Sequence, residues 1–353
     1  MNQRVIISQN LETELAIAIS ECEHDRLFVL TDEVTHEKCL PLVKDYFCLK
    51  GAQVITIGST DVHKDLHSLA QVWQGLGEGG ADRHSCLINL GGGMVTDLGG
   101  FAASTFKRGI DFINIPTTLL SMVDASVGGK TGVNFNGLKN EIGVFNDSRY
   151  VVLDTRFLHT LDDENLRSGY AEMLKHGLIS DEQTWAELLQ FDLARPDFAH
   201  LQQMVATSVQ VKEKVVAIDP HEKGIRKALN YGHTFGHAFE SFSLKHHAEG
   251  VSPILHGYAV AYGMICELYL STVKAGFPSE QMRQTVAFIR DYYGRFDITC
   301  DDYDELIALM RHDKKNTAGV INFTLLDAIG EVLINQTATD EEIREALDFF
   351  REG

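Results

Sequence analysis

The segment Asn230-Tyr-Gly-His-Thr-Phe-Gly-His237 combines residue types that can bind a metal ion or an anionic ligand. On a helix, His233 and His237 project from the same face because residues four apart are neighbours there. The zinc-peptidase pattern His-Glu-x-x-His is absent, since Thr234 stands where that pattern has its catalytic Glu. The spacing therefore indicates a divalent metal site with a different chemistry, a histidine pair acting on one ligand, or a helix that carries two histidines by chance.

Two histidines need at least one further ligand to hold a metal ion. One candidate is Glu172, whose helical segment also places Lys175 on the same face, and another is His256, at the expected start of an apolar helix. His246 and His247 lie nearby in sequence but are equally consistent with a solvated loop. Mixed imidazole and carboxylate ligands suit zinc and similar divalent ions, so the sequence predicts such a site.

Several cations stand beside glycine, asparagine or histidine although the chain is acidic, with a formal net charge of −19. Each of them alone is consistent with a solvated surface, but their recurrence at such positions favours a pocket for a small anion. These cations are Arg108, Lys130, Lys139, Lys175, Lys212, Arg226, Lys314 and Lys315, and Asn140 and Asn230 accompany them.

Glycine-rich loops raise the question of a nucleotide. Gly91-Gly-Gly-Met-Val-Thr-Asp97 follows an apolar strand and precedes a helix, which is where a pyrophosphate can bind, although a simple glycine turn is the alternative. Pro116-Thr-Thr118 repeats this arrangement one strand later. Ser126-Val-Gly-Gly-Lys130 lacks the Walker spacing, but Lys130 can still meet an anion there. The literal Gly-x-Gly-x-x-Gly at Gly75–Gly80 follows a helix instead of a strand, so we expect an ordinary loop.

The pattern of elements changes near residue 156. Before it, apolar runs alternate with helical patterns, with strands expected at 27–30, 53–57, 86–90, 112–115 and 151–153 and helices at 34–49, 63–73 and 94–106. This alternation predicts a parallel sheet covered by helices. Beyond it, helices are expected at 164–179, 181–190, 200–218, 234–244, 256–275, 279–293, 303–311 and 339–350, with strands at 321–326 and 331–334. We therefore expect an α/β domain at 1–156 and a mostly α-helical domain at 157–353.

The composition is that of an ordinary soluble globular protein, with 44% hydrophobic and 23% charged residues. The acidic balance argues against nucleic acid and anionic membranes as partners. No apolar stretch of about 18 residues and no signal-peptide pattern is present. The six cysteines form no Cys-x-x-Cys pair, so we expect reduced thiols in a cytoplasmic protein.

Taken together, the motifs resemble the 3-dehydroquinate synthases in order and spacing, from about Asp32 to Gly330. The likeness is carried by the runs quoted above and by Arg108-Gly, Lys139-Asn140, Ala171-Glu-Met-Leu-Lys175 and His256-Gly. It implies a Rossmann-like NAD-binding domain followed by an α-helical metal-binding domain, with the active site in the cleft between them, and a homodimer. It also implies conversion of 3-deoxy-D-arabino-heptulosonate 7-phosphate to 3-dehydroquinate and phosphate, a step of the shikimate pathway toward chorismate and the aromatic amino acids.

The resemblance also assigns roles to residues. It gives a divalent metal, zinc or cobalt, to Glu172, His233 and His256, and it places His237 at the substrate. The groups that it assigns to phosphate, carboxylate and hydroxyls are Arg108, Lys130, Asn140, Lys175, Lys212, Arg226, Asn230, His237 and one of Lys314 and Lys315. Those that it assigns to NAD are Asp32, Asp61, Lys64, Gly92, Gly93, Met94, Asp97, Thr117, Thr118, Leu120, Asp124, Lys130, Lys139, Phe157 and Thr160.

Four positions depart from the family pattern, namely Val34, Asp61, Ala125 and Tyr258, where the family usually has Asn, Glu, Ser and Glu. Three other functions share some of these features. They are a related sugar-phosphate cyclase acting on another substrate, a metal-dependent polyol or alcohol dehydrogenase, and a non-enzymatic sensor. Arg226 favours a substrate with a carboxylate, because a guanidinium suits planar anions.

Overall fold

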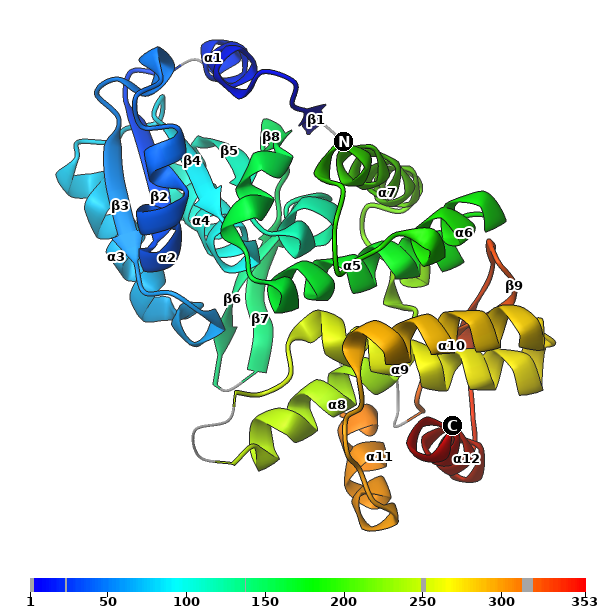
Figure 1. The fold of residues 1–353 in the computed structure, drawn as a ribbon. Helices are drawn as coiled ribbons and strands as arrows, with labels where there is room; N and C mark the ends of the chain where they lie inside the picture. Colours follow the sequence, from blue (N-terminus) through cyan, green and yellow to red (C-terminus); the bar gives the residue numbers. More distant parts are fainter. Residues whose placement is uncertain (1–2, 23, 137, 249–251, 313–319) are drawn as a thin grey trace. The chain divides into compact units, whose positions relative to one another are not determined.

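The computed structural model describes residues 3–22, 24–136, 138–248, 252–312 and 320–353 (Figure 1). The chain forms two compact units. Unit 1 comprises Met1–Asp162 and Phe198–Val209, and unit 2 comprises Asp163–Asp197 and Gln210–Gly353. Among the described residues, no helix is both long and apolar enough to cross a membrane.

Unit 1 is built on a six-stranded parallel sheet with the strand order β1-β8-β5-β4-β2-β3. The strands are β1 (Arg4–Ile7), β2 (Leu27–Asp32), β3 (Gln53–Ile57), β4 (Cys86–Gly91), β5 (Asp111–Pro116) and β8 (Tyr150–Leu153). Every residue of β4 is buried, which explains why its sequence is apolar except at Asn89, whose side-chain amide donates to Asn114 Oδ1 of β5. The strand order reverses between β2 and β4, and parallel α/β sheets bind ligands at the carboxyl ends of strands at such a reversal.

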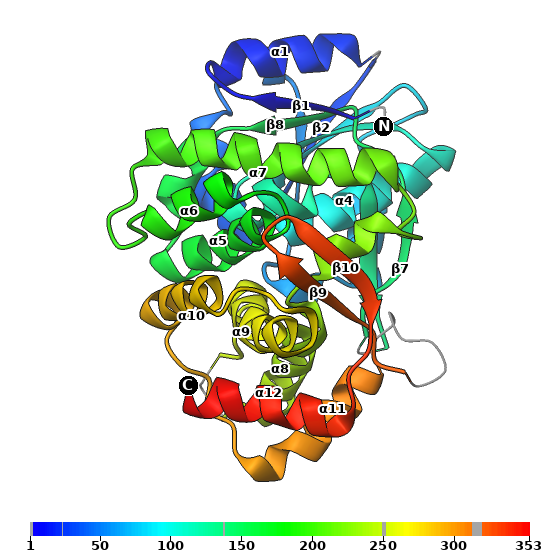
Figure 2. The same cartoon turned by 90° about the vertical axis from the view of Figure 1, so that its right-hand side faces the viewer.

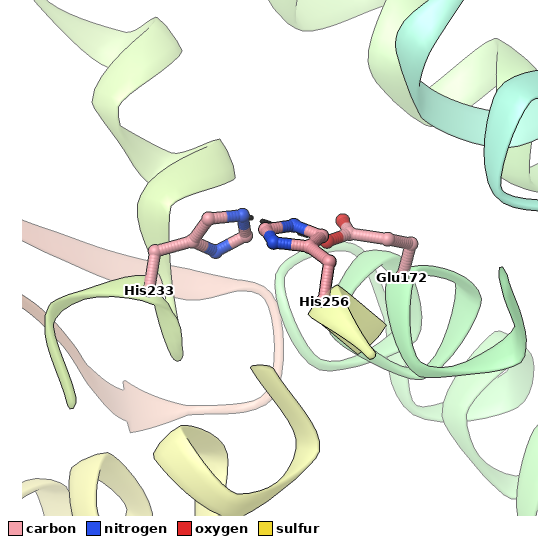
Figure 3. A group of neighbouring side chains, drawn as sticks. All are labelled: Glu172, His233 and His256. Carbon is pink, nitrogen blue, oxygen red and sulfur yellow. Dashed lines mark ion pairs between the residues drawn. The ribbon is translucent and has the colours of Figure 1, made fainter. Parts of the chain in front are cut away.

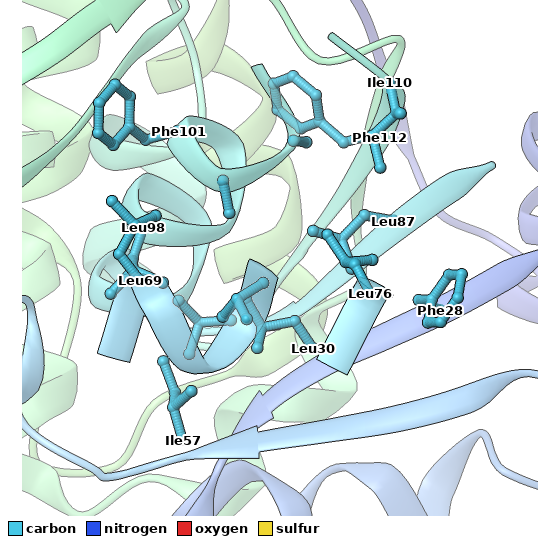
Figure 4. Packing of buried hydrophobic residues seen from close by; sticks show 14 of the residues in the cluster. Phe28, Leu30, Ile57, Leu69, Leu76, Leu87, Leu98, Phe101, Ile110 and Phe112 are labelled. Carbon is cyan, nitrogen blue, oxygen red and sulfur yellow. The ribbon is translucent and has the colours of Figure 1, made fainter. Parts of the chain in front are cut away.

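Two helices pack against one face of this sheet, α3 (Leu66–Glu78) and α4 (Gly93–Thr105) (Figure 4). Their apolar side chains, among them Leu69 and Leu98, form a single core with Phe28 and Phe112 of the strands. Each such fully buried side chain contributes about 1.5–3 kcal/mol relative to an exposed one. This core holds α4 against β4 and so fixes the glycine turn that joins them.

All five strands expected in the first domain are confirmed, but two expected helices are wrong in extent. The helix expected at 34–49 is only α2 (Glu33–Lys38), followed by the short 3-10 turns Leu40–Leu42 and Phe47–Leu49. Pro41 lies in the first of these turns, and its ring and missing N–H cannot continue an α-helix. The helix expected at 63–73 begins at Leu66, where the Asp65 side chain accepts from Ser68 N, and it continues to Glu78. Gly75 and Gly77, expected in a loop, therefore lie inside α3.

In the described part of unit 1, the sequence patterns missed one α-helix and three β-strands. They are β1, α1 (Leu11–Glu21) and the antiparallel pair β6 (Lys130–Phe135) and β7 (Leu138–Phe145). Strand β1 has only four residues, too few to show a period. In β7 nearly every residue is exposed, so no alternation of apolar and polar residues marks it as a strand.

Unit 2 is mostly helical, as expected. Its elements are α5 (Asp163–Leu178), α6 (Glu182–Gln190), the end of α7 (Phe198–Ile218), α8 (His233–His246), α9 (His256–Leu270), α10 (Ser279–Tyr293), α11 (Tyr303–Arg311), α12 (Asp340–Glu352) and the antiparallel strands β9 (Phe323–Ala328) and β10 (Glu331–Gln336). Helix α9 is buried along most of its length and packs against α5, α8, α10 and α12 (Figure 2). The expected extension of α9 to residue 275 instead widens into a π-helical turn after Leu270.

Glycines set how closely α9 approaches its neighbours. A Cβ atom at Gly263 would lie 1.9 Å from the carbonyl oxygen of Gly232, just before α8. One at Gly257 would lie 1.8 Å from the carbonyl oxygen of Ser168 in α5. Since real Cβ atoms do not approach an oxygen so closely, α9 can occupy this position only with glycine at both places. The close packing brings the first turns of α8 and α9 next to the middle of α5.

We predict that Gly263→Ala destabilises the protein by about 1–3 kcal/mol, because the added methyl group overpacks the contact between α8 and α9. The matched control is Gly77→Ala in α3, where a Cβ atom would meet nothing within 4 Å. That change should be neutral or stabilise by up to about 1 kcal/mol, since alanine favours a helix over glycine. Urea unfolding of the two variants measures the difference. Equal stabilities would show that α9 can shift without cost.

Candidate metal and nucleotide sites

Three side chains of unit 2 converge with their ligand atoms within 4.8 Å of one another: Glu172, His233 and His256 (Figure 3). Glu172 Oε1 lies 3.4 Å from His233 Nε2 and 3.5 Å from His256 Nε2. Glu172 comes from the middle of α5, whereas the two histidines are the first residues of α8 and α9. The structure thus brings together the three residues that the sequence predicted as metal ligands.

The donor set of this group fits a divalent cation. Glu172 is fully buried, and its Oε1 atom accepts no hydrogen bond although it faces two imidazole nitrogens. A cation between the three side chains would satisfy this oxygen and both nitrogens together. Two nitrogen donors and one carboxylate are also the protein ligands of many catalytic zinc sites, in which a further position stays open for water or substrate.

Nearby charges keep the buried carboxylate ionised. Burial raises the pKa of Glu172, but Lys175, His233 and His256 together outweigh burial and hold that pKa well below its usual range. Lys175 Nζ contacts Glu172 Oε2 one turn further along α5. For His256, burial lowers the pKa, whereas Glu240 and Glu172 raise it more strongly, to about 10. The group is therefore a tightly coupled set of opposite charges in a largely dry environment.

His233 is oriented by the backbone that precedes α8. Gly232 has φ = 78°, in the left-handed region that glycine adopts without strain. The Nδ1 atom of His233 lies 3.1 Å from the carbonyl oxygen of Tyr231. If Nδ1 carries the proton and donates it there, Nε2 has a lone pair directed toward Glu172, which is the tautomer that a metal ligand needs.

His237 lies beside this group without belonging to it. Its ring centroid is 5.3 Å from that of His233 and 6.1 Å from that of His256. Among the described residues, the groups with metal-ligand spacing do not include it. The two histidines of the Asn230–His237 segment therefore differ in position, although the helical spacing alone treated them alike.

The cations predicted in the second domain are buried where the structure describes them. Lys175, Lys212 and Arg226 are 1%, 6% and 2% exposed. Arg226 Nη1 donates to the carbonyl oxygen of Pro220 at 2.6 Å, which anchors the guanidinium. Burying a cation is costly unless an anion compensates it, and for Lys175 that anion is Glu172. Lys314 and Lys315 lie outside the described residues.

Two acidic residues beside these cations were not predicted from the sequence. Asn230 Nδ2 donates to Glu222 Oε1 at 2.6 Å, and the backbone amide of Arg226 donates to Asp219 Oδ2 at 3.1 Å. These contacts hold the short 3-10 helix Ile225–Asn230 that carries Arg226 and Asn230. No spacing rule distinguishes these two acids from the other carboxylates of a chain with 50 Asp and Glu residues.

In unit 1, predicted cofactor residues gather at the carboxyl ends of adjacent strands. Asp32 ends β2 and accepts from Thr35 N at 2.7 Å, which caps α2. Gly92 and Gly93 follow β4, and the start of α4 has no side-chain cap, so backbone N–H groups are available there. Thr117 N, after β5, donates to the carbonyl oxygen of Gly91 at 3.0 Å. This arrangement suits a pyrophosphate at the reversal of strand order.

Lys64, which the family resemblance assigned to NAD, contacts Asn140, which it assigned to the substrate. Lys64 Nζ donates to Asp97 Oδ2 at 2.5 Å and to Asn140 Oδ1 at 2.6 Å, and Lys64 is 5% exposed. Lys139 Nζ lies 3.3 Å from Asp61 Oδ2 nearby on the surface. Predicted NAD and substrate groups of unit 1 therefore form one connected polar cluster.

The other predicted residues of unit 1 vary in exposure. Arg108 and Lys130 are exposed, and Arg108 has φ = 72°, which is uncommon for a residue with a side chain. The side chain of Phe157 is fully buried, and its carbonyl oxygen accepts from Thr160 Oγ1 at 2.7 Å. A cofactor contact at Phe157 would therefore use its backbone. Of the others, Thr118, Asp124, Met94 and Leu120 are partly exposed.

Comparison with known proteins decides the family. Family models described as the N-terminal and C-terminal parts of 3-dehydroquinate synthase match residues 54–168 and 169–316. A 3-dehydroquinate synthase from Parabacteroides distasonis is 53% identical over 351 residues, covering 99% of this chain and 98% of the relative. The chain belongs to the 3-dehydroquinate synthase family. A member from Pseudoalteromonas atlantica is 36% identical, covering 92% of this chain and 90% of the relative.

Solved structures support the fold. A 2-epi-5-epi-valiolone synthase from Streptomyces hygroscopicus, with NAD+ and Zn2+ bound, has a TM-score of 0.83 and 25% identity, covering 99% of this chain and 97% of that one. A 2-deoxy-scyllo-inosose synthase complexed with carbaglucose-6-phosphate, NAD+ and Co2+ has a TM-score of 0.83 and 23% identity, covering 99% and 96%. The predicted fold, a Rossmann-like α/β part and a helical part, is confirmed. The enzymatic function predicted from the motifs is also confirmed at the level of the 3-dehydroquinate synthase family.

We predict that Lys175→Met destabilises the metal-free protein by about 3–5 kcal/mol, because it leaves the buried carboxylate of Glu172 without its nearest cation. The control is Lys274→Met, which removes an ion pair with Glu342 between side chains that are 28% and 30% exposed. That change should cost less than about 1 kcal/mol. Urea unfolding in the presence of a chelator measures both. A similar small loss in the two variants would mean that the histidines alone compensate Glu172.

Proposed function

We propose that this chain converts 3-deoxy-D-arabino-heptulosonate 7-phosphate to 3-dehydroquinate and phosphate, with NAD as a catalytic cofactor and a divalent metal ion. The observation that carries the proposal is the 53% identity to a 3-dehydroquinate synthase along almost the whole chain. The convergence of Glu172, His233 and His256 supports it independently, since a metal-ligand set stands where the motifs predict one. The related cyclases with solved structures are no more than 25% identical, so another sugar phosphate is not favoured as substrate.

The three side chains of the metal group would hold the ion through one carboxylate oxygen and two imidazole nitrogens. When bound, the metal ion supplies Lewis-acid polarisation of a substrate oxygen. Glu172 brings the negative charge that attracts the cation, and its contact with Lys175 fixes the orientation of the carboxylate. His237, whose ring lies beside that of His233, would hydrogen-bond a substrate hydroxyl near the ion.

The buried cations of unit 2 would hold the anionic parts of the substrate. Arg226 suits the planar carboxylate through paired hydrogen bonds, whereas Lys175 and Lys212 are compact donors suited to phosphate or hydroxyl oxygens. Asn230 joins them on the same short helix as Arg226. Holding both ends of the sugar in one geometry lowers the entropic part of the barrier. Because the leaving phosphate can itself accept a proton, few protein bases are needed.

Unit 1 would bind NAD at the carboxyl ends of β2, β4 and β5. When bound, NAD supplies reversible hydride transfer, so it is regenerated within each turnover. The N–H groups at the start of α4 would take the pyrophosphate, with Gly92 and Gly93 permitting its close approach. We assign the remaining predicted contacts, from Asp32 to Thr160, to the same cofactor. This division makes residues 1–156 the NAD domain and residues 157–353 the domain for metal and substrate.

We further propose that the ion is zinc, with cobalt as a functional substitute, and that the protein is a cytoplasmic homodimer. The choice of metal rests on the imidazole and carboxylate ligands and on the Zn2+ and Co2+ ions of the two related cyclases. The dimer and the compartment rest on the resemblance to the family. Elemental analysis and light scattering of the purified protein test the metal and the dimer directly.

We expect the protein, supplied with the heptulosonate phosphate and trace NAD, to release many phosphates for each NAD without net formation of NADH. This follows because the hydride removed from the substrate returns to it later in the reaction. Phosphate release and absorbance at the NADH band are followed together, with glucose 6-phosphate as the comparison substrate. NADH that accumulates in proportion to the substrate consumed would contradict the proposal and indicate a dehydrogenase.

We predict that His233→Ala loses both metal and activity, whereas His237→Ala retains metal and loses much of the rate. The reason is that His233 Nε2 faces Glu172, while His237 lies beside the group. Elemental analysis of both variants after dialysis measures the metal, and the phosphate assay measures the rate. The pair is its own control, since both are His→Ala changes in the first two turns of α8. Equal metal content in His233→Ala and the unaltered protein would refute the ligand assignment.

A further inference from the structure

Helices α8 and α9 each carry a histidine of the metal group and, further along, a buried glutamate. Helix α8 has His233 and, seven residues on, Glu240, while α9 has His256 and, eleven residues on, Glu267. Seven and eleven residues are close to two and three helical turns, so each glutamate lies on nearly the same face as the histidine of its own helix. Glu240 is 6% exposed and Glu267 is fully buried.

Each glutamate makes its contact at the start of the other helix. Glu240 Oε2, on α8, lies 3.3 Å from Nδ1 of His256 at the start of α9. The opposite ring nitrogen, His256 Nε2, lies 3.5 Å from Glu172 Oε1. A carboxylate that accepts from one nitrogen of an imidazole fixes both its tautomer and its ring orientation, and so presents the other nitrogen to a metal ion.

Glu267 makes the reciprocal contact from α9. Its Oε2 accepts from Gly232 N at 2.7 Å, and its Oε1 accepts from Thr234 N at 3.0 Å. These amides belong to the residues on either side of His233. Because Gly232, the N-cap of α8, has no side chain, Glu267 takes the place of the usual capping residue. A carboxylate at a helix N-terminus is also favoured by the helix dipole, so this contact holds the backbone of His233 firmly.

We propose that Glu240 and Glu267 are positioning residues of the metal centre, each carried by one helix and holding the histidine at the start of the other. The proposal rests on the proposed function, because it takes Glu172, His233 and His256 to be metal ligands. Two buried carboxylates are costly where apolar side chains would pack without penalty. Glu240 contacts one ligand histidine directly, and Glu267 holds the backbone on both sides of the other. The crossed arrangement ties the two helix starts together, so that a displacement of either helix disturbs both ligands.

The test measures metal binding by purified protein with zinc as the probe, in competition with a chromophoric chelator. We expect Glu240→Ala to weaken zinc binding about 10–100-fold, the usual effect of losing a carboxylate behind a metal-binding histidine. Glu240→Gln should lose less, because its amide oxygen can still accept from His256. Glu267→Gln should also weaken binding, since one neutral oxygen cannot serve both amides with equal strength. Where Glu267→Gln does not fold, Glu267→Asp, which keeps the charge on a shorter stem, replaces it.

The control is Glu305→Gln. Glu305, on α11, accepts from Lys245 Nζ at 2.7 Å and lies 3.0 Å from His246 Nε2, at the far end of α8. The Glu305→Gln substitution therefore removes a carboxylate that contacts a histidine of α8, but this histidine is not part of the metal group. The visible spectrum of the cobalt-loaded protein adds a readout that stability alone would not change. Shifted ligand-field bands in the Glu240 and Glu267 variants, and unchanged bands in Glu305→Gln, are expected.

The outcomes separate this inference from the proposed function. If the unaltered protein binds neither zinc nor cobalt, the proposed metal site fails, and the inference fails with it. If the unaltered protein binds zinc and the Glu240 and Glu267 variants match Glu305→Gln in affinity and cobalt spectrum, the inference alone is overturned. Melting temperatures of the metal-free variants show whether a weaker affinity for zinc accompanies a loss of fold. If the Glu240 and Glu267 variants bind zinc more weakly but keep the cobalt bands of the unaltered protein, the glutamates act on stability, and the positioning role is refuted.

Discussion

The helical unit depends on one buried negative charge. Glu172 is fully buried, and an isolated carboxylate in such a place would cost several kcal/mol. Its compensation comes from Lys175 on the same helix and from two imidazoles on other helices. The imidazoles reach it only if α8 and α9 both begin beside the middle of α5. The glycine contacts between these helices, and the glutamates that hold the histidines, follow from that requirement.

The same balance of charges explains how an acidic chain can hold cations in its interior. The net charge of −19 sets the electrostatic field far from the protein surface, whereas the binding of a small ion depends on the charges close to it. Lys175, Lys212 and Arg226 are buried, so water screens their charge little. In unit 1, Lys64 is likewise buried and is shared between a carboxylate and an amide oxygen. Burial and contacts within the fold restrict the side chains of such groups, which favours precise positioning.

Much of the fold could be predicted from periodicity. The five strands of the first domain and the helices α10 and α11 lie where the patterns place them, because strong apolar periods reflect burial directly. The prediction of a helix at 34–49 was wrong because Pro41 interrupts an otherwise helical pattern. The strands β6 and β7 were missed because exposed strands carry no apolar alternation. Local sequence patterns therefore predict elements whose apolar residues are buried at a regular period. They fail for exposed strands and for a helix that a proline interrupts.

The sequence by itself determined the family and the fold class, and it named candidate residues for binding a metal, a nucleotide and an anion. Helical spacing treated His233 and His237 alike, and the family resemblance separated them. The tertiary structure supplies the physical reason, since His233 and not His237 lies within reach of Glu172 and His256. Spacing along a helix defines which face a residue occupies, but what lies opposite that face is supplied by other helices. Glu240 and Glu267 illustrate the same limit, since only distances through space distinguish these two among 50 acidic residues.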